Sequence, residues 1–548
     1  MIGRRMPSFD RHALAELRDR KVHVVGLAGS EGTAVTRFLS GAGVSEITVH
    51  DVAEGEALRQ AFSRSHVGLP RKKRDERWRE LAALPLTRRL GEDYLTGIEA
   101  ADLIFAGQAW YLYERNRKRL EPLIESGVPV LGLMDLYFGL APARILAVTG
   151  SNGKSTTSRI VEHVMRAAGL RVWYAGNERR SVQVLDRLDE MSPEDWLVLE
   201  VSNRHLRGLR LPSGAGAEIA VVTNVLPNHL DEHGGTMAGY AAVKRRLVAD
   251  QPAGGIAVLN ADDDRTRAFV GDAPGECLLF SRKEALEAGA WLDEGRIRLH
   301  TSAAREVEDL GPVGAARLPG THNDSNVLAA VLAARAAGAA ADAIREALPR
   351  FRGLRHRIQF VWGADGVSYY DDLNATTPLA TVAALRALGE DTVLIIGGDD
   401  KGLALDELTT EILARVARLV VLPGPGGARI AEAVYAAREA ASRRRPAIDR
   451  FEDLAPAIRS VVAESKEGQA VLLSPACPYF FRRFYIEGAE ERGFRALLRE
   501  ATAEVAAQAD AEATTPDTSA QAVTEANRDA GSADEAGPNT GAQPRATS

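Results

Sequence analysis

Residues 147–157 read Ala-Val-Thr-Gly-Ser-Asn-Gly-Lys-Ser-Thr-Thr, and this stretch decides how the rest of the chain is interpreted. An apolar run (144–148) leads into two glycines, and the hydroxyl-rich segment after Lys154 is typical of a helix start. The backbone N–H groups of such a turn and of the helix N-terminus converge on one point, which suits a polyphosphate. The sequence therefore predicts an ATP-binding loop made of Gly150, Ser151, Asn152, Gly153, Lys154, Ser155 and Thr156.

Two side chains of this loop have expected roles in phosphate chemistry. Lys154 is expected to reach the β- and γ-phosphates of ATP, and Ser155 is expected to ligate Mg²⁺. The strict Walker pattern has a glycine where this chain has Val148, so the match is to a shorter Gly-x-x-Gly-Lys-Ser-Thr loop. The alternative is an ordinary glycine turn with an exposed lysine. The strand, the glycine spacing, the lysine and the hydroxyl all favour the phosphate loop.

Similar apolar runs recur along the chain and alternate with helix-like segments rich in alanine and arginine. The expected buried strands are residues 21–25, 144–148, 196–200, 219–223, 256–259, 392–396 and 470–473. This alternation predicts an α/β fold with parallel sheets that are covered by helices on both faces. Ligands of such sheets bind at the carboxyl ends of the strands, so the residues directly after these runs are the first candidates for a site.

The bulk properties restrict the class of protein. The net charge of −7 gives no reason to expect nucleic acid or membrane as a partner, and no apolar run of about 18 residues is present. Two cysteines, Cys277 and Cys477, do not indicate a disulfide framework, and the N-terminus does not read as a secretory signal. We therefore expect a cytoplasmic monomer that acts on small molecules.

The 548 residues are too many for one ordinary domain, and segments that contain glycine or proline indicate where domains join. A hinge is expected within residues 139–143 and a second joint near residues 351–355, which predicts domains over 1–143, 144–352 and 353–500. Residues 501–548 contain no aromatic residue, leucine or isoleucine, so this tail is predicted to be disordered. The basic stretch at 71–74 is interpreted as a solvated loop or helix end.

The phosphate loop closely resembles the ATP loop of the Mur ligases, which build the peptide of bacterial peptidoglycan. Further segments resemble that family in the same order, and the likeness extends over about residues 20–500. They are residues 199–202, 223–231, 240–244, 259–263, 319–326, 353–357 and 473–477. The resemblance implies a Rossmann-like N-terminal domain for a uridine nucleotide substrate, a central ATPase domain, and a Rossmann-like C-terminal domain for an incoming amino acid.

The resemblance also implies the reaction. ATP would phosphorylate a UDP-N-acetylmuramoyl-L-alanine-type carboxylate, and the acyl phosphate would then react with an acidic amino acid, with glutamate expected, to form an amide. Two anions must approach each other in such a step, so cations are needed to neutralise their charge. ATP and Mg²⁺ are therefore the expected cofactors.

Three residues are candidates for the metal site besides Ser155. Glu200 follows an expected strand and matches a family Mg²⁺ ligand; the alternatives are a helix N-cap partner or a surface charge. His229 would bind a second Mg²⁺, and a hydrogen-bonded structural histidine is the competing interpretation. Lys244 matches the lysine that is carbamylated in the family, which would turn a cation into an anionic oxygen ligand. From the residues alone, Lys244 is one more lysine on a helix face.

Four residues further along the chain are expected to contact ATP. Asn323 and Asn326 lie one turn apart on one helix face, and the resemblance makes them adenine contacts, with helix capping as the alternative. Arg357 is expected to supply charge to the γ-phosphate when the domains close. Asp372 matches a family aspartate on the ribose and hinge side.

The substrate-binding residues are expected in the outer domains and at their edges. The glycine-rich turn at 26–32, with Asp51 after the next strand, suits a nucleotide, although such a turn alone is weak support. The resemblance assigns Asn177 to the uridine substrate and Lys401 to the side-chain carboxylate of the acceptor. The full predicted set is Gly29, Ser30, Asp51, Asn177, Ser202, His205, Thr376, Lys401, Ser474 and Tyr479.

Several departures from the family pattern fall at the substrate ends. A family lysine is replaced by Asn374, the Ser-Ser-Phe-Gln-Leu segment reads Ser-Asn-Arg-His-Leu at 202–206, and the Ser-Pro-Gly loop reads Ala-Gly-Gln at 106–108. A family serine is replaced at 478–479 by Pro-Tyr. The ATP machinery is nearly complete, whereas both substrate pockets differ from the family pattern.

These departures keep other functions open. One is a divergent Mur-family ligase with a different carboxylate or amine, such as a folylpolyglutamate-like or poly-amino-acid ligase. Another is a nucleotide-binding regulator that has lost turnover, against which the retained Lys154, Glu200, His229 and Lys244 argue. A simple P-loop hydrolase would not need the C-terminal segments at 397–401 and 474–477.

Overall fold

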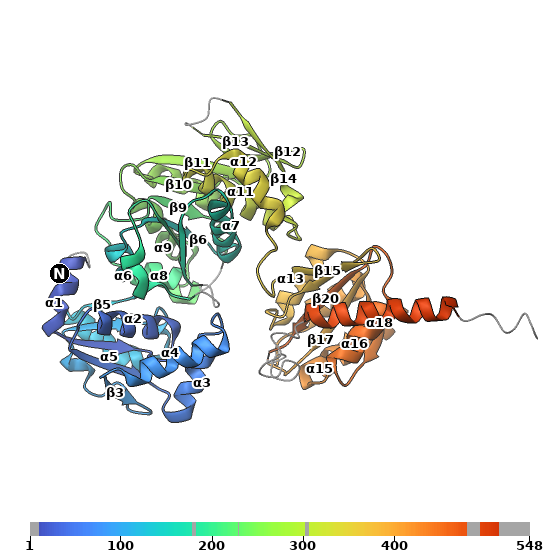
Figure 1. Ribbon diagram of the computed structural model, residues 1–548, viewed down its shortest axis with the longest axis horizontal. Coiled ribbons are helices and arrows are strands. Elements are labelled where there is room, and N and C mark those ends of the chain that lie inside the picture. The colour runs from blue at the N-terminus through green and yellow to red at the C-terminus, as the bar shows by residue number, and fades with distance from the viewer. Residues whose placement is uncertain (1–9, 178–181, 228–229, 302–305, 479–493, 515–548) are drawn as a thin grey trace, which may run out of the picture. The chain divides into compact units, whose positions relative to one another are not determined.

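The computed structural model describes residues 10–177, 182–227, 230–301, 306–478 and 494–514 (Figure 1). The chain forms two compact units. The first runs to Phe360 and includes Arg386–Leu388, and the second contains Val361–Leu385 and the chain from Gly389 onward. None of the helices in the described ranges is long and apolar enough to cross a membrane.

The first sheet has five parallel strands in the order β3-β2-β1-β4-β5. Alternate residues of β1 face different cores: Val24 packs into one cluster and Val25 into another, so helices cover both faces. This strand order is the doubly wound one, with a switch point between β1 and β4. The strands are β1 Lys21–Val25, β2 Glu46–Asp51, β3 Thr87–Leu90, β4 Leu103–Ala106 and β5 Val130–Leu131.

The helices of this sheet include one that starts with the basic stretch at 71–74. Its first three residues are exposed, which confirms the interpretation as a solvated helix end. The α-helices are α1 Arg11–Glu16, α2 Ser30–Gly41, α3 Gly55–Ser65, α4 Arg71–Ala83, α5 Glu114–Glu125 and α6 Leu133–Leu140. Short 3-10 helices are η1 Leu17–Asp19, η2 Ile98–Ala100 and η3 Trp110–Leu112.

The second sheet has nine strands in the order β14-β13-β12-β11-β10-β9-β6-β8-β7. Its strands are β6 Arg144–Thr149, β7 Val172–Gly176, β8 Trp196–Glu200, β9 Ile219–Val222, β10 Ile256–Asn260, β11 Glu276–Ser281, β12 Gly289–Asp293, β13 Arg296–His300 and β14 Glu308–Pro312. Strands β6 to β12 are parallel, as predicted. The sheet is mixed at one edge, where β12 pairs with β13 and β13 pairs with β14 in antiparallel fashion. The turn at Glu294 and Gly295 has two positive φ values, 48° and 74°, which is the geometry of a tight hairpin.

Helices α7 and α11 pack together against one face of the second sheet (Figure 1). The opposite face shares a continuous core with helix α6, which explains why the first two sheets form one compact unit. The α-helices are α7 Lys154–Ala167, α8 Asn203–Gly208, α9 Met237–Ala249, α10 Asp264–Arg267, α11 His322–Ala336 and α12 Ala341–Ala347. The 3-10 helices are η4 Leu185–Glu190, η5 Leu230–His233, η6 Ala268–Asp272, η7 Val313–Ala316 and η8 Leu348–Arg350. The domain boundaries at 143 and 352 stay predictions.

The third sheet has six strands in the order β15-β16-β20-β17-β18-β19, with parallel pairing from β16 to β19. Its strands are β15 Gln359–Ala364, β16 Val367–Asp371, β17 Thr392–Gly397, β18 Val416–Val421, β19 Ala447–Arg450 and β20 Ala470–Ala476. Its helices are α13 Pro378–Leu388, α14 Asp406–Arg415, α15 Pro425–Ala440, α16 Leu454–Glu464 and α18 Phe494–Thr514. All seven strands expected from the sequence are therefore confirmed.

The C-terminal helix corrects one prediction. Helix α18 continues through residues 501–514, which were predicted to be disordered. The reason is that Phe494, Leu498 and Ala501 lie on one face of the helix and are buried in the core of the third sheet. Alanine, abundant in this segment, is also the best helix former. Residues 515–548 lie outside the described residues.

Candidate active site

Two glycines give the loop between β6 and α7 its shape. Gly150 has φ +148°, and a Cβ atom there would lie 1.9 Å from the Thr223 hydroxyl oxygen. Gly153 has φ +83°, and a Cβ atom there would lie 2.1 Å from the Asn326 side-chain oxygen. Both positions combine a left-handed backbone with a neighbour that leaves no room for a side chain. The loop therefore makes a tight turn against Thr223 and Asn326, and α7 begins directly after it.

Ser151 and Asn152, which lie between the two glycines, hold the loop in place through hydrogen bonds to other parts of the protein. The backbone N–H of Ser151 donates to the Asn224 carbonyl at 2.9 Å, and that of Asn152 donates to the Asn224 side-chain oxygen at 2.9 Å. The Ser151 hydroxyl lies 2.9 Å from the Leu226 carbonyl and 3.1 Å from the Tyr240 hydroxyl. These two N–H groups are thus already engaged within the protein. The N–H groups of the first turn of α7, which begins at Lys154, have no intrahelical partner and are the ones left for phosphate.

Two lysines share one carbonyl oxygen of the loop. The ammonium group of Lys154 donates to the Gly150 carbonyl at 2.9 Å and to the Ser151 carbonyl at 3.0 Å. The ammonium group of Lys244, from α9, donates to the same Gly150 carbonyl at 2.9 Å, and its side chain is fully buried. Without the family resemblance Lys244 reads as one more lysine on a helix face, and the structure brings its ammonium group to the Gly150 carbonyl of the loop.

The pKa values of both lysines are lowered. Burial lowers the pKa of Lys244 well below its ordinary value, and the positive charge of Lys154 adds to this effect. Burial also lowers the pKa of Lys154, with Glu200 opposing the change and Arg357 reinforcing it. A lowered pKa increases the fraction of neutral amine, which is the reactive form of a lysine.

Glu200 lies at the carboxyl end of β8 and is 1% exposed. One carboxylate oxygen accepts a hydrogen bond from the Asn177 amide at 3.2 Å, whereas the other is buried without a hydrogen-bond partner among the residues that the structure describes. A buried carboxylate oxygen is costly unless a cation or donor satisfies it. Glu200 thus fits the predicted Mg²⁺ ligand better than a surface charge.

Ser155 is buried in the first turn of α7, which follows β6, the strand that pairs with β8, and it is the second residue that would hold Mg²⁺. Across the described ranges, no group of three or more histidine, cysteine, aspartate or glutamate side chains is arranged for a metal ion. Ser155 and Glu200 offer a hydroxyl and a carboxylate oxygen, and Mg²⁺ commonly binds through one or two such protein groups together with phosphate oxygens and water. His229, the predicted ligand of a second ion, lies outside the described residues.

The two asparagines of α11 lie side by side, as their spacing predicts. The Asn326 amide donates to the Asn323 side-chain oxygen at 2.9 Å, and the Asn323 amide donates to the Pro319 carbonyl at 2.7 Å. The Thr157 hydroxyl reaches Asn326 at 3.4 Å, which links α11 to α7. Arg357 is exposed, and its charge lowers the pKa of Lys154. Contacts of these residues with ATP stay predictions.

The glycine turn after β1 is closed by a carboxylate. One oxygen of Asp51 accepts the N–H of Ala28 at 2.8 Å, and the other accepts the N–H of Ala53 at 3.0 Å. Asp51 therefore shapes the turn from within the protein. Gly29 and Ser30 follow at the N-terminus of α2, where a helix favours an anion.

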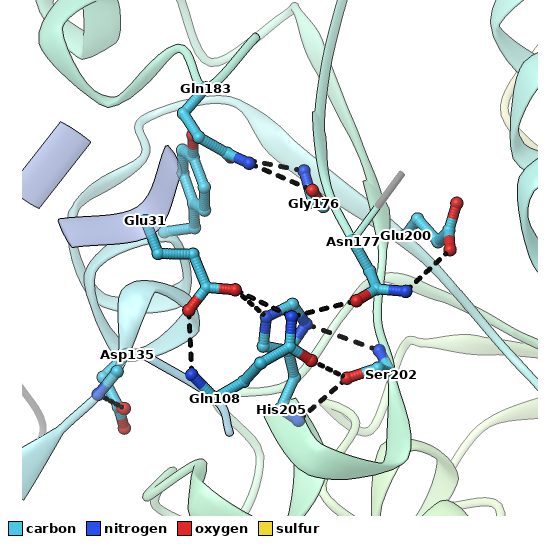
Figure 2. A network of polar contacts seen from close by, with 11 residues as sticks. Glu31, Gln108, Asp135, Gly176, Asn177, Gln183, Glu200, Ser202 and His205 are labelled. Carbon is cyan, nitrogen blue, oxygen red and sulfur yellow. Dashed lines mark hydrogen bonds and ion pairs between the residues drawn. The ribbon is translucent and has the colours of Figure 1, made fainter. Parts of the chain in front are cut away.

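A chain of side-chain hydrogen bonds runs from this turn to Glu200 (Figure 2). The Gln108 amide donates to Glu31 at 2.8 Å and to Asn177 at 2.9 Å, and the Ser202 hydroxyl donates to the Gln108 side-chain oxygen. His205 lies 3.0 Å from Glu31 through Nε2. Three members, Asn177, Ser202 and His205, were predicted from the sequence, and the structure brings them together. Glu31 and Gln108 were missed, although Gln108 follows the end of β4 at the switch point of the sheet.

A cavity of about 1000 Å³ opens beside this network. Its lining comes from the carboxyl edge of the first sheet, from α5 and α6, and from α8. The lining includes the polar side chains of Glu31, Gln108, Tyr111, Glu121, Arg207 and Arg210. This volume is at the upper end of what small-molecule ligands occupy in proteins, so the cavity accommodates a large ligand.

The predicted residues of the second unit form two groups. The Ser474 hydroxyl donates to Asp372 at 2.8 Å and lies 2.7 Å from the hydroxyl of Thr381, a residue that the sequence did not single out. Thr376 and Lys401 line a small cavity of about 10 Å³. Tyr479 lies outside the described residues.

Comparisons with known proteins agree with this geometry. A family model described as Mur ligase middle domain matches residues 148–334, and one described as Mur ligase, glutamate ligase domain matches residues 356–477. The chain is 36% identical to a UDP-N-acetylmuramoylalanine–D-glutamate ligase of Symbiobacterium thermophilum, over 87% of this chain and 97% of that protein. It is 34% identical to the ligase of the same name from Pelotomaculum thermopropionicum, over 88% and 97%.

A solved structure supports the fold independently. The crystal structure of a UDP-N-acetylmuramate-alanine ligase from Thermotoga maritima matches 90% of this chain and 100% of that chain, with a TM-score of 0.50 and 16% identity. At this identity the likeness shows the fold alone. The fold class and the family resemblance stated from the sequence are confirmed.

Proposed function

Because the chain belongs to the Mur ligase family, whose members form amide bonds at the expense of ATP, we propose that it joins UDP-N-acetylmuramoyl-L-alanine to glutamate. The relatives' names specify D-glutamate, and we extend that configuration to this chain. One observation carries the proposal: Lys154 and Lys244 both donate to the Gly150 carbonyl, and their loop lies beside the Glu200 carboxylate of β8, one oxygen of which has no hydrogen-bond partner in the described part of the chain.

The loop is suited to phosphoryl transfer. The first turn of α7 and Lys154 would bind the phosphates of ATP, and the carboxylate of the first substrate would attack the γ-phosphorus to give an acyl phosphate and ADP. Ser155, Glu200 and His229 would hold Mg²⁺, which neutralises phosphate charge. Arg357 would add positive charge near Lys154. The amine of glutamate would then attack the acyl carbon, and phosphate would leave with one oxygen of the original carboxylate.

Lys244 is proposed to act as a carbamate. Its buried amine has a strongly lowered pKa, so a neutral fraction is available to react with CO₂. The product would be anionic and would replace an uncompensated buried cation beside Lys154 by an oxygen ligand for a metal. Asn323, Asn326 and Asp372 are proposed to contact the adenosine of ATP.

The substrates are assigned to the two outer sheets. The nucleotide sugar would bind in the large cavity of the first unit, near Gly29, Ser30, Asn177, Ser202 and His205. Thr376, Lys401, Ser474 and Tyr479 would receive glutamate. A cytoplasmic location belongs to the same proposal, because ATP is drawn from that compartment.

The experiment measures ADP formation by the purified full chain with each substrate alone and with both together. The expected result is ADP release only when UDP-N-acetylmuramoyl-L-alanine and D-glutamate are both present, with one amide formed per ADP. L-glutamate and D-aspartate serve as matched acceptors. Turnover with no acceptor would indicate a hydrolase, and nucleotide binding without any turnover would indicate a regulator; either result contradicts the proposal.

A further inference from the structure

A buried glutamine, Gln183, binds the backbone at the end of β7 (Figure 2). Strand β7 is an edge strand of the second sheet, so among the described residues no further strand pairs with the outward backbone groups of its last residue, Gly176. The Gln183 amide donates to the Gly176 carbonyl at 3.0 Å, and its oxygen accepts the Gly176 N–H at 3.4 Å. One side chain thus takes the place of a paired strand at this position.

The amide of Gln183 is held in one orientation by Tyr137 of α6. The backbone N–H of Val184 donates to the Tyr137 hydroxyl at 2.9 Å, and the hydroxyl donates its own hydrogen to the Gln183 oxygen at 3.1 Å. Tyr137 is fully buried and Gln183 is 8% exposed. Because a carbonyl only accepts, the nitrogen of the Gln183 amide faces Gly176 and its oxygen faces Tyr137.

The end of β7 lies directly against the strand that carries Glu200. Gly176 has φ +117°, and a Cβ atom there would lie 2.3 Å from the Glu200 carbonyl oxygen. The next residue, Asn177, donates its backbone N–H to that carbonyl at 2.9 Å and its side-chain amide to the Glu200 carboxylate at 3.2 Å. Glycine backbone is conformationally permissive, so the direction of the Asn177 side chain depends on how Gly176 is held. The hydrogen bonds of Gln183 supply that restraint.

From this chain of contacts, and resting on the proposed role of Glu200 as a Mg²⁺ ligand, we propose that Gln183 is a positioning residue for the metal site. It acts through Gly176 and Asn177, which orient the Glu200 carboxylate, and Tyr137 supports it from α6. Partners that hydrogen-bond to a metal ligand commonly contribute about 10- to 100-fold to metal affinity. Gln183 acts on that partner and not on the ligand itself, so we expect a smaller contribution of about three- to tenfold.

The test measures ADP binding to the full chain by calorimetric titration at a series of Mg²⁺ concentrations. Its readout is the Mg²⁺ midpoint, the concentration that gives half of the maximal gain in ADP affinity, and this readout does not depend on turnover. Gln183→Leu removes both the donor and the acceptor of the side chain and should raise the midpoint about three- to tenfold. Tyr137→Phe keeps the ring and removes the hydroxyl that orients Gln183. It should raise the midpoint about two- to threefold, and it provides the test if Gln183→Leu does not fold.

Gln251→Leu is the matched control, because Gln251 is also a buried glutamine that binds backbone groups of the second sheet. It is 2% exposed, and its amide donates to the carbonyls of Ala217 and Ile256 at 3.1 Å each. Those two residues lie directly before β9 and at the start of β10, whereas Glu200 lies at the carboxyl end of β8. Gln251→Leu should therefore destabilise the same sheet and leave the Mg²⁺ midpoint unchanged.

A double variant tests the route from Gln183 to the metal site. If Gln183 acts through Asn177, Gln183→Leu should cause no further shift of the midpoint in an Asn177→Ala background, so the two effects should not add. In ADP formation with both substrates, kcat of Gln183→Leu should return to within about twofold of wild type at saturating Mg²⁺, which general damage to the site would not allow.

The outcomes separate this inference from the proposed function. Equal shifts of the Mg²⁺ midpoint in Gln183→Leu and Gln251→Leu overturn the inference, as does no shift in Gln183→Leu or, if that variant does not fold, in Tyr137→Phe. A shift that persists undiminished in the Asn177→Ala background also overturns it. These results leave the ligase reaction untouched, whereas ADP binding by the wild-type chain that does not respond to Mg²⁺ at all would contradict the proposed metal site itself.

Discussion

The phosphate loop and the wall of the large cavity both lie at the carboxyl ends of parallel strands in one compact unit, yet they are held in different ways. The loop is fixed mainly through its backbone: Gly150 and Gly153 allow the turn, and its N–H and carbonyl groups bond to Asn224 and to two lysines. The wall is fixed by side chains that meet from distant segments, such as Glu31 with His205 and Gln108 with Asn177.

This difference explains where the chain keeps the family pattern and where it departs from it. A backbone turn with no room for a Cβ atom tolerates few residues, so the ATP loop keeps the family form. A network of side-chain hydrogen bonds can be rebuilt with other residues as long as every buried group finds a partner. Substrate preference can therefore change at the cavity wall while the activation chemistry is retained.

The largest effect is expected at the loop itself. Lys154→Ala should lower kcat for ADP formation by about a thousandfold or more, because it removes a cation that stabilises the transferring phosphoryl group. Binding of UDP-N-acetylmuramoyl-L-alanine, measured by calorimetry, should stay within about twofold of wild type. Equal losses of kcat and of substrate binding would show that the two regions do not divide the work in this way.

A glycine-to-alanine substitution should lower the free energy of unfolding more in the phosphate loop than in an ordinary turn with positive φ. Gly97 has φ +80° with open space around a Cβ atom, whereas Gly153 has φ +83° with Asn326 in the way. Gly97→Ala should lower the free energy of unfolding by about 1 kcal/mol, from the backbone conformation alone. Gly153→Ala should lower it by about 3 kcal/mol, because Asn326 must also move. Urea unfolding followed by circular dichroism measures both, and similar losses would refute the steric argument.

Substitution of two amides of the network should have different effects, one on the Mg²⁺ requirement and the other on binding of the nucleotide sugar. Asn177→Ala removes the support of Glu200, so the Mg²⁺ concentration needed for half-maximal activity should rise about 10- to 100-fold. Gln108→Ala removes donors of Glu31 and should raise KM for the nucleotide sugar, with the Mg²⁺ requirement within about threefold of wild type. A Mg²⁺ requirement that rises equally in both variants would contradict this separation.

The smallest effect concerns pH. Burial, together with the neighbouring His50, lowers the pKa of His23 to about 4. The unfolded chain binds this proton near pH 6.5 and the folded chain only near pH 4, so stability falls as pH falls through that window. His23→Gln should reduce the loss between pH 7 and 4.5 by about 2 kcal/mol in urea unfolding. Residues 150–157 contain no histidine, so the phosphate loop itself contributes no histidine proton to this loss. An unchanged pH profile in the variant would exclude His23 as its source.

The sequence predicted what local spacing determines. The seven strands, the phosphate loop and the position of Glu200 after β8 follow from apolar runs and the residues directly behind them. Lys244 needed the family resemblance, because a buried lysine and a surface lysine on a helix read alike. The helix over 501–514 was missed because its buried face is small and alanine-rich, and only tertiary packing against the third sheet marks it as ordered.

The network around Glu31 could not be predicted for a different reason. Its members come from four separate segments, and no local pattern states that Gln108 reaches Asn177 or that His205 reaches Glu31. The strand pattern marked the end of β1 as a candidate position, but it did not predict β4, which precedes Gln108. Which groups meet there depends on the arrangement of α2 and α8, which only the folded structure supplies.

The central claim is that ATP activates a carboxylate as an acyl phosphate at the Gly150 loop. The most direct measurement follows ¹⁸O from the labelled alanyl carboxylate of UDP-N-acetylmuramoyl-L-alanine, with D-glutamate and ATP present. The account predicts that each released phosphate carries one ¹⁸O atom from that carboxylate, and that Lys154→Ala releases none. Phosphate that forms at the normal rate without ¹⁸O would mean that water, not the carboxylate, receives the phosphoryl group, and would contradict the account.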